Sequence, residues 1–237
     1  MIPIYWDKNF ERELLMLNYL DSRNLSKIWW LSAVTIIIGA LLGTDSTLPG
    51  VLPYFAFIFF GGISLYLQYG RGILAAILEK PKKGSWKLVI PVLIISYVIA
   101  FIFLGIGNLL GNQPVTNGAT GSGPVATQLI RLFWICISLI GEEIITAALT
   151  LPFVSLLMKR VNKRQAWIYG AIIGSLLFGM LHFRAYDWNL YQMLIPIGLG
   201  RLPFTWLWVK SDSLWPAVIT HILYDVLIFL PAILFGI

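Results

Sequence analysis

Hydrophobic residues run along this chain in long blocks that contain almost no charge. No Asp, Glu, Lys or Arg occurs from Leu88 to Ile130, and none occurs from Ser46 to Gly70. A helix of about 20 apolar residues crosses the hydrocarbon core of a bilayer. The blocks lack the period-two alternation of membrane barrel strands, so they predict helices whose backbone groups pair internally, as lipid requires.

These blocks predict an all-α fold: a polytopic bundle of about seven transmembrane helices that forms a single domain over residues 1–237. The expected spans are roughly residues 28–46, 48–69, 88–110, 129–157, 165–183, 190–209 and 214–236. The first 27 residues mix four acidic with four basic side chains and have no long apolar core, so we do not expect a signal peptide there. Their leucines predict an amphipathic segment that lies on the membrane surface.

Charge follows the connections between these spans and predicts the orientation. The N-terminal segment and the second, fourth and sixth connections hold 14 of the 17 Lys and Arg residues. Basic connections stay in the cytoplasm, so we expect a multi-pass protein of the cell membrane with a cytoplasmic N-terminus. The net charge of +6 therefore reflects membrane topology and does not indicate a nucleic-acid partner. Composition agrees, because 58% of residues are hydrophobic and only 12% are charged, about half the charge of a soluble domain.

A small set of ionisable residues lies within the expected spans. Each such residue costs about 2.5–3.5 kcal/mol on insertion scales, and the interiors of the first three spans contain none. The exceptions lie in the last four spans and include both histidines of the chain: Glu142, Glu143, His182, Arg201, His221 and Asp225. One buried Glu–His pair could simply fix helix packing. Two adjacent carboxylates with two histidines and an aspartate favour a functional site.

The spacing of these residues predicts which of them meet. The fourth and fifth spans form a hairpin about the basic turn from Lys159 to Arg164, and reflection through its midpoint places Glu142 next to His182. His221 and Asp225 are four residues apart, so they share one face of the seventh helix. The fifth span also has small positions at which helices can approach closely, at Gly170, Gly174 and Gly179.

Carboxylate and imidazole groups in a dry pocket suit acid–base chemistry on water. A glutamate can take a proton from water, and a histidine can orient the water or pass the proton on. A second histidine can donate a hydrogen bond to a developing oxyanion. The same groups could bind zinc instead, with Glu142, His182 and His221 as the ligands. The chain has no His-Glu-x-x-His helix of the soluble metalloprotease type, and its one cysteine, Cys136, allows no intrachain disulfide.

Three short motifs carry these residues, in order, on the fourth, fifth and seventh spans. They are Glu142-Glu143-Ile-Ile-Thr-Ala147, Phe178-Gly-Met-Leu-His182 and His221-Ile-Leu-Tyr-Asp225, and a Ser-Leu-Trp-Pro run at 213–216 precedes the third. They resemble the Glu-Glu-x-x-x-Arg, Phe-x-x-x-His and His-x-x-x-Asn/Asp motifs of the CPBP family, the CAAX-protease and bacteriocin-processing intramembrane peptidases. The resemblance covers about residues 131–229, and a protease core at about residues 129–236 is expected.

The resemblance implies hydrolysis of a peptide bond within the membrane, in a peptide or a membrane-anchored precursor. In such enzymes the first glutamate and the histidine of the second motif activate water, which assigns these roles to Glu142 and His182. The third motif lies at the oxyanion, which places His221 and Asp225 there. Glu143 is the supporting carboxylate.

One position departs from the family pattern, because Ala147 stands where arginine is usual. A cation that would order the glutamates is therefore missing, and either Arg184 or Arg201 replaces it or the activity is lost. The second interpretation is thus a catalytically inactive membrane protein that acts in bacteriocin immunity or as a peptide-binding scaffold. A third is a proton-coupled carrier, which the lack of a repeated half disfavours.

The two histidines are not at the same height if every span is a straight helix. His182 is near the outer end of its span, whereas His221 is about two turns into the seventh span from the cytoplasmic side, a difference on the order of 15 Å. The sixth span links their helices and has two prolines and two glycines between Pro196 and Pro203. We therefore expect a kink or an unwound segment between Leu194 and Phe204. The alternative is that the fourth and fifth helices project further into the cytoplasm.

Overall fold

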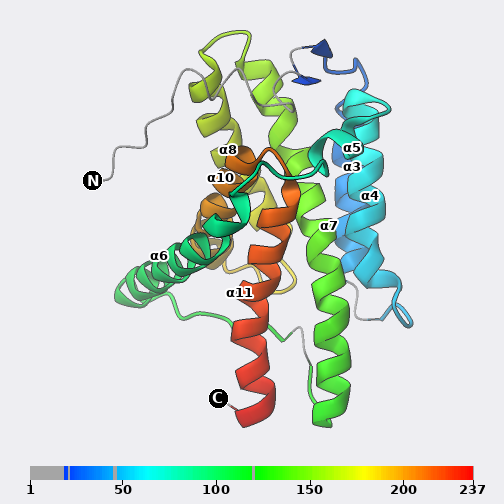
Figure 1. Ribbon diagram of the computed structural model, residues 1–237. Coiled ribbons are helices and arrows are strands. Elements are labelled where there is room, and N and C mark those ends of the chain that lie inside the picture. Colours follow the sequence, from blue (N-terminus) through cyan, green and yellow to red (C-terminus); the bar gives the residue numbers. More distant parts are fainter. Residues whose placement is uncertain (1–18, 21, 45–46, 119–120, 237) are drawn as a thin grey trace.

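The computed structural model describes residues 19–20, 22–44, 47–118 and 121–236, and no residue in these ranges lies in a strand (Figure 1). The surface segment predicted at residues 1–27 lies mostly outside them. The helices that the structure describes are α3 (Leu31–Gly43), α4 (Leu52–Tyr69), α5 (Ile73–Ile77), η1 (Ser85–Leu88), α6 (Val89–Leu109), α7 (Val125–Leu157), α8 (Lys163–Met180), α9 (Leu190–Gln192), η2 (Met193–Gly198), η3 (Leu199–Arg201), α10 (Leu202–Ser211) and α11 (Leu214–Phe235). The all-α prediction is confirmed for this part of the chain.

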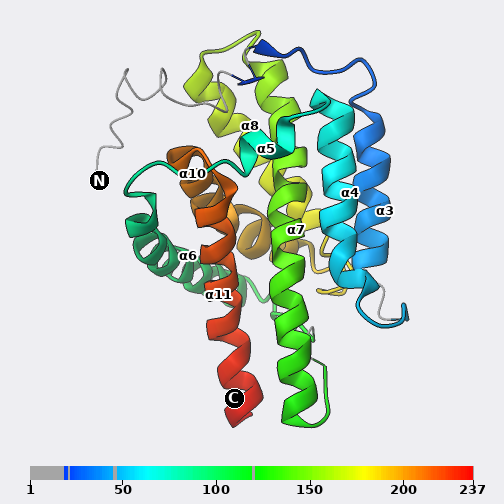
Figure 2. The same ribbon diagram turned by 45° about the vertical axis from the view of Figure 1, so that its right-hand side comes forward.

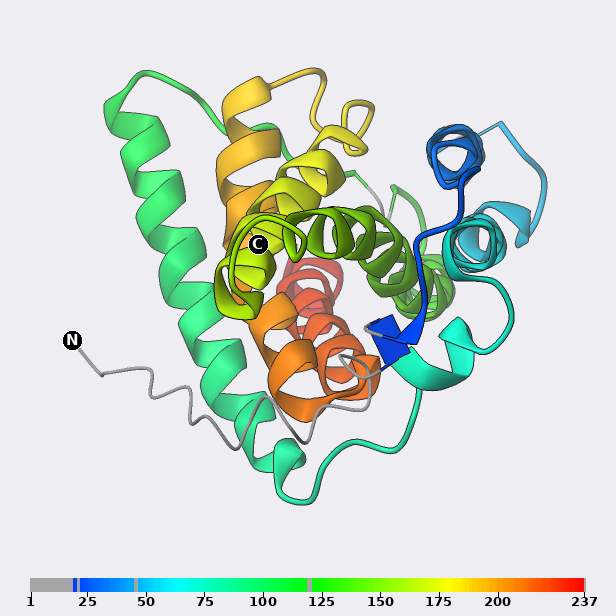
Figure 3. The ribbon, with the colours of Figure 1, turned by 90° about the horizontal axis from the view of Figure 1, so that it is seen from above.

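Helix α7, of 33 residues, is the centre of the bundle. It packs against α4 on one side and against α8 and α11 on the other, and α3 packs on α4. Figure 3 shows this arrangement along the bundle, with α6 crossing on the far side of α10 and α11. A residue in the middle of α7 therefore lies between α4, from an earlier part of the chain, and α8 and α11, from later parts.

Four of the described helical segments are long and apolar enough to cross a membrane: Leu52–Tyr69, Ser85–Leu109, Val125–Leu157 and Leu214–Phe235. Helix α3 is apolar but has only 13 residues, about 20 Å, which is shorter than a hydrocarbon core of about 30 Å. The predicted count of seven spans and the cytoplasmic N-terminus both stay predictions.

The close approach expected of the glycines in α8 is confirmed. A Cβ atom at Gly174 would collide with Thr150 of α7, and one at Gly179 would collide with the carbonyl oxygen of Met193. Gly170 similarly faces the backbone and side chain of Val154. Because these positions lack a side chain, α8 contacts α7 and η2 at backbone distance, and the turn that follows α8 is held beside the middle of α7.

The predicted sixth span departs from a straight α-helix, as its prolines and glycines indicate. It begins as α9, becomes a π-helical turn in η2, tightens to a 3₁₀ turn in η3 and returns to an α-helix in α10. Pro196 lies inside the π turn and has no N–H to donate. The irregular segment between Leu194 and Phe204 is thus found where it was predicted, as a change of helix type.

The hairpin of α7 and α8 also extends beyond the start of α11, and this contributes to the alignment of the two histidines. Glu143 is 14 residues, about 21 Å, from the end of α7, whereas His221 is 7 residues, about 10 Å, from the start of α11. Figures 1 and 2 both show the α7–α8 turn beyond the start of α11. The α7–α8 hairpin is displaced along the bundle, and the sixth segment is irregular as well. Both of the explanations offered for the alignment of the two histidines therefore apply.

Candidate active site

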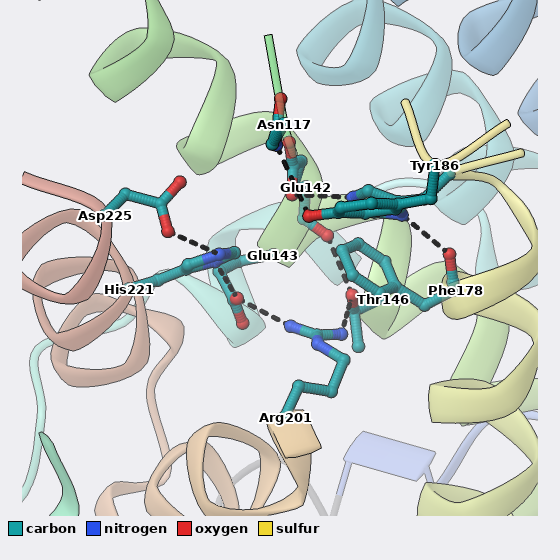
Figure 4. A network of polar contacts seen from close by, with 10 residues as sticks. Asn117, Glu142, Glu143, Thr146, Phe178, Tyr186, Arg201, His221 and Asp225 are labelled. Carbon is teal, nitrogen blue, oxygen red and sulfur yellow. Dashed lines mark hydrogen bonds and ion pairs between the residues drawn. The ribbon is translucent and has the colours of Figure 1, made fainter. Parts of the chain in front are cut away.

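The structure brings all five predicted site residues together in one polar network (Figure 4). Glu142 and Glu143 come from the middle of α7, and His221 and Asp225 come from α11. His182 lies in the turn that follows the end of α8 at Met180, so it sits just past the helix that was expected to carry it.

Glu143 is the buried carboxylate of the pair, with 2% of its side chain exposed. Its Oε1 atom lies 2.6 Å from Nη2 of Arg201 and 2.8 Å from Nδ1 of His221. A carboxylate accepts hydrogen bonds and donates none, so both nitrogens donate to this one oxygen. Glu143 therefore connects η3 to α11 through α7.

The Arg201 side chain is buried and fixed from three directions. Besides Glu143, its Nη1 atom donates to Oγ1 of Thr146, and its Cζ atom lies 4.0 Å from the centre of the Phe178 ring. Thr146 in turn donates to the main-chain oxygen of Glu142 at 2.8 Å. The guanidinium thus stacks on an aromatic ring while it pairs with a carboxylate, an arrangement that suits arginine and not lysine.

Glu142 and His182 form the accessible side of the site. Their side chains are 15% and 19% exposed, and Oε2 of Glu142 lies 3.9 Å from Nε2 of His182. Nδ1 of His182 lies 3.1 Å from the main-chain oxygen of Phe178, to which it can donate, and this fixes the ring with Nε2 toward Glu142. The separation is too long for a direct hydrogen bond and leaves both atoms able to contact the same water molecule.

His221 and Asp225 complete the site from α11. Nε2 of His221 lies 4.0 Å from Oδ1 of Asp225, and the side chains are 11% and 20% exposed. The imidazole stacks near the Phe204 ring, with ring centres 5.1 Å apart. Since Nδ1 is engaged by Glu143, Nε2 is the nitrogen of His221 on the side of Asp225.

Residues from the connection between α6 and α7 contact α9 and the turn that carries His182. The amide of Gln192 forms two hydrogen bonds with the backbone of Val115, at 2.7 and 2.9 Å, and Asn117 donates to the Tyr186 hydroxyl at 3.3 Å. The Tyr186 ring stacks on His182, with ring centres 6.1 Å apart. Burial raises the pKa of Tyr186 to about 12, so this phenol keeps its proton at neutral pH.

The three candidate zinc ligands, Glu142, His182 and His221, each contact another side chain of the site. No group of three or more His, Cys, Asp or Glu side chains in the described part of the chain is placed to hold a metal ion. Of the three candidates, His221 has one ring nitrogen bonded to Glu143 and the other facing Asp225, while His182 faces Glu142. Zinc binding stays a prediction, and the mechanism proposed for this site uses no metal.

Fold and site together define a class: a helical membrane protein whose interior holds carboxylates and imidazoles within reach of water. Residues 124–227 match the model of a family described as type II CAAX prenyl endopeptidase Rce1-like, which is a family of proteases. The match includes all five site residues and Arg201, and it confirms the resemblance drawn from the three motifs. No curated protein and no solved structure matches the chain.

Several contacts of the site were not singled out from the sequence. Thr146 is three residues after Glu143, so its position on the same helix face was available from the spacing. Phe178 belonged to the second motif, but its stacking on Arg201 depends on a helix that is distant in sequence. Tyr186 and Asn117 meet across a long connection, and no local pattern indicates such a contact.

Proposed function

We propose that this protein is an intramembrane endopeptidase that hydrolyses a peptide bond in a peptide or a membrane-anchored precursor. The family match supports the reaction class, and one geometric observation carries the mechanism: Glu142 and His182 face each other across 3.9 Å on the accessible side of the site. A water molecule about 2.8 Å from each atom fits this gap. Both of the groups that activation of water needs are therefore next to one position.

In the proposed reaction, Glu142 accepts a proton from this water while the water oxygen attacks the carbonyl carbon of the scissile bond. His182 orients the water. His221, protonated on both nitrogens, donates from Nε2 to the developing oxyanion, and Asp225 beside it stabilises the imidazolium. The C–N bond then breaks as the proton on Glu142 passes to the leaving nitrogen, which yields a carboxylate and an amine.

Purified protein in detergent tests this proposal with two quenched-fluorescent peptides. One ends in a prenylated CAAX sequence, and the other has the same sequence without the prenyl group. Cleavage of the first alone supports a CAAX-type specificity, and equal cleavage of both supports a broader endopeptidase. Mass spectrometry of the products identifies the bond that is broken.

Membrane proteins from cells that express the wild-type chain provide the second arm. Their newly formed termini are compared with those from cells that express Glu142→Gln, a change that keeps the shape of the side chain and removes its ability to accept a proton. Termini present only with the wild type identify natural substrates. If neither peptides nor membrane proteins show cleavage that depends on Glu142, the peptidase proposal is wrong and the inactive peptide-binding scaffold takes its place.

A further inference from the structure

The helix that carries both glutamates has no cation one turn after Glu143, because Ala147 stands there. Arg201 of η3 provides a cation beside Glu143 instead. We propose that Arg201 is a positioning residue of the active site, which fixes Glu143 and, through it, the imidazole of His221. The proposal rests on the proposed function above. Arg201 also supplies the cation that Ala147 does not, since it comes from η3 and pairs with Glu143.

The contacts of the Arg201 guanidinium are those of a group built into the site. Only 3% of the side chain is exposed, so it does not extend to the membrane surface, as a long side chain in a span often does. One terminal nitrogen donates to Glu143, the other donates to Thr146, and the plane lies against Phe178. A buried carboxylate without such a partner would not stay ionised, so Arg201 is what holds Glu143 as an acceptor of hydrogen bonds.

The connection from Arg201 to His221 passes through a single atom. Oε1 of Glu143 accepts from Nη2 of Arg201 and from Nδ1 of His221. While Glu143 is ionised it can only accept, so it holds one proton of the His221 imidazolium on Nδ1 and leaves the Nε2–H toward Asp225 and the substrate. A protonated Glu143 could donate to Nδ1 instead, which would reverse the ring's hydrogen bonding. Arg201 therefore fixes the orientation of the His221 ring through Glu143, without touching the substrate.

The irregular sixth element explains how a residue so far along the chain reaches Glu143. Arg201 is the last residue of η3, directly after the π-helical turn η2 and before α10. A π turn adds a residue to a helix and rotates everything that follows, and such turns are frequent at functional sites. The other candidate cation, Arg184, is exposed and donates to the main-chain oxygen of Leu41 instead.

The test uses full-length protein and five variants: Arg201→Ala, Arg201→Lys, the double variant Arg201→Ala/Ala147→Arg, Arg184→Ala as the matched control, and Glu142→Gln. Ala147 is one turn from Glu143 on the same helix, so an arginine there can use the space that Arg201→Ala vacates. The first readout is kcat and KM on the peptide that the wild type cleaves. The second is the imidazole ¹⁵N–¹H spectrum, which is simple because the chain has two histidines.

We expect Arg201→Ala to lower kcat about ten- to a hundredfold with KM nearly unchanged, the range typical of residues that orient a catalytic group. Arg201→Lys should recover part of kcat, and so should the double variant, while Arg184→Ala should match the wild type. In the spectrum, the strongly hydrogen-bonded Nδ1–H signal of His221 should be lost in Arg201→Ala and return in the double variant. If Arg201→Ala does not fold, Arg201→Lys and the spectrum carry the same test.

Two results would overturn the positioning role. One is a kcat for Arg201→Ala close to that of the wild type while Glu142→Gln is inactive. The other is a His221 signal that does not change when Arg201 is removed. By contrast, a wild type that cleaves nothing overturns the proposed function, and the spectrum still decides whether Arg201 fixes His221.

Discussion

The two glutamates at the centre of α7 are adjacent in sequence and lie in opposite environments. Glu143 is buried, and one of its oxygens binds both Arg201 and His221. Glu142 keeps 15% of its side chain exposed and faces His182 across a gap that a water molecule can fill. Successive residues of a helix point about 100° apart, so Glu143 turns toward Arg201 and His221 while Glu142 turns toward His182.

This difference separates two tasks that a single carboxylate cannot perform well. A glutamate that is tightly paired with arginine is a poor base, because the pairing stabilises the form that has already lost its proton. A glutamate without such a partner accepts a proton more readily but fixes nothing in place. The structure uses Glu143 to order the site and leaves Glu142 for the proposed proton transfer.

The largest effect is expected from Glu142→Gln. The amide keeps the shape of the side chain but cannot accept the proton of water, so kcat should fall about 100- to 10,000-fold. Stability should be unchanged or slightly higher, because this carboxylate is not held by a cation in the way Glu143 is. Peptide cleavage and thermal unfolding in detergent measure the two quantities. Wild-type turnover in this variant would remove Glu142 from the chemistry and end the comparison.

Glu143→Ala should instead destabilise the fold. Removing one partner of a buried ion pair leaves Arg201 charged and unpaired, which costs about 3–5 kcal/mol of unfolding free energy. Equilibrium unfolding in detergent measures this loss, and Glu142→Ala is the matched control on the neighbouring residue. The double variant Glu143→Ala/Arg201→Met should recover most of the stability because it leaves no unpaired guanidinium in the interior. Equal stability of Glu143→Ala and Glu142→Ala would contradict the division of tasks.

A smaller loss is expected from Thr146→Val, which removes the hydroxyl that accepts from Arg201 while keeping the side-chain volume. The guanidinium then loses one acceptor, at a cost of about 1–3 kcal/mol. Thr150→Val is the control one turn further along α7, since the Thr150 hydroxyl has no hydrogen-bond partner among the described residues. A loss of the same size in both variants would mean that the Thr146 hydroxyl does not support Arg201.

The smallest effect is expected from Asn117→Ala on the accessible side. Its hydrogen bond to Tyr186 is 3.3 Å long and partly exposed, so its loss should cost no more than about 0.5 kcal/mol and change kcat by less than about threefold. The exposed neighbour Thr116 provides the control variant Thr116→Ala. A much larger fall in kcat for Asn117→Ala, with wild-type activity in the control, would make the α6–α7 connection part of the catalytic site.

The fold class could be predicted because lipid leaves a chain few alternatives. A long uncharged block such as Leu88–Ile130 has to pair its backbone within itself, and only a helix does so locally. The same cost of charge in lipid made the site residues conspicuous. Glu142, Glu143, His182, His221 and Asp225 could all be named as candidates from the sequence, because the interiors of the first three apolar spans hold no ionisable residue.

The hairpin geometry was also predictable, since reflection through a short turn depends only on counting residues along two antiparallel helices. It placed Glu142 at the level of His182, and the structure has these residues 3.9 Å apart. The prolines and glycines near Pro196 similarly indicated where the sixth segment would leave the α-helical path. Proline and glycine effects on a helix can be predicted from the sequence because they act within a few residues of the chain.

What only the tertiary structure decided is which partner each polar group takes. The sequence left Arg201 with several possible partners. Packing chose among them, because the π and 3₁₀ turns before α10 set the direction of the Arg201 side chain, and the close contact at Gly179 set the distance between α8 and η2. Composition and spacing show that ionisable side chains within the membrane must pair with one another. The rotation of one helix against another determines which side chains form each pair.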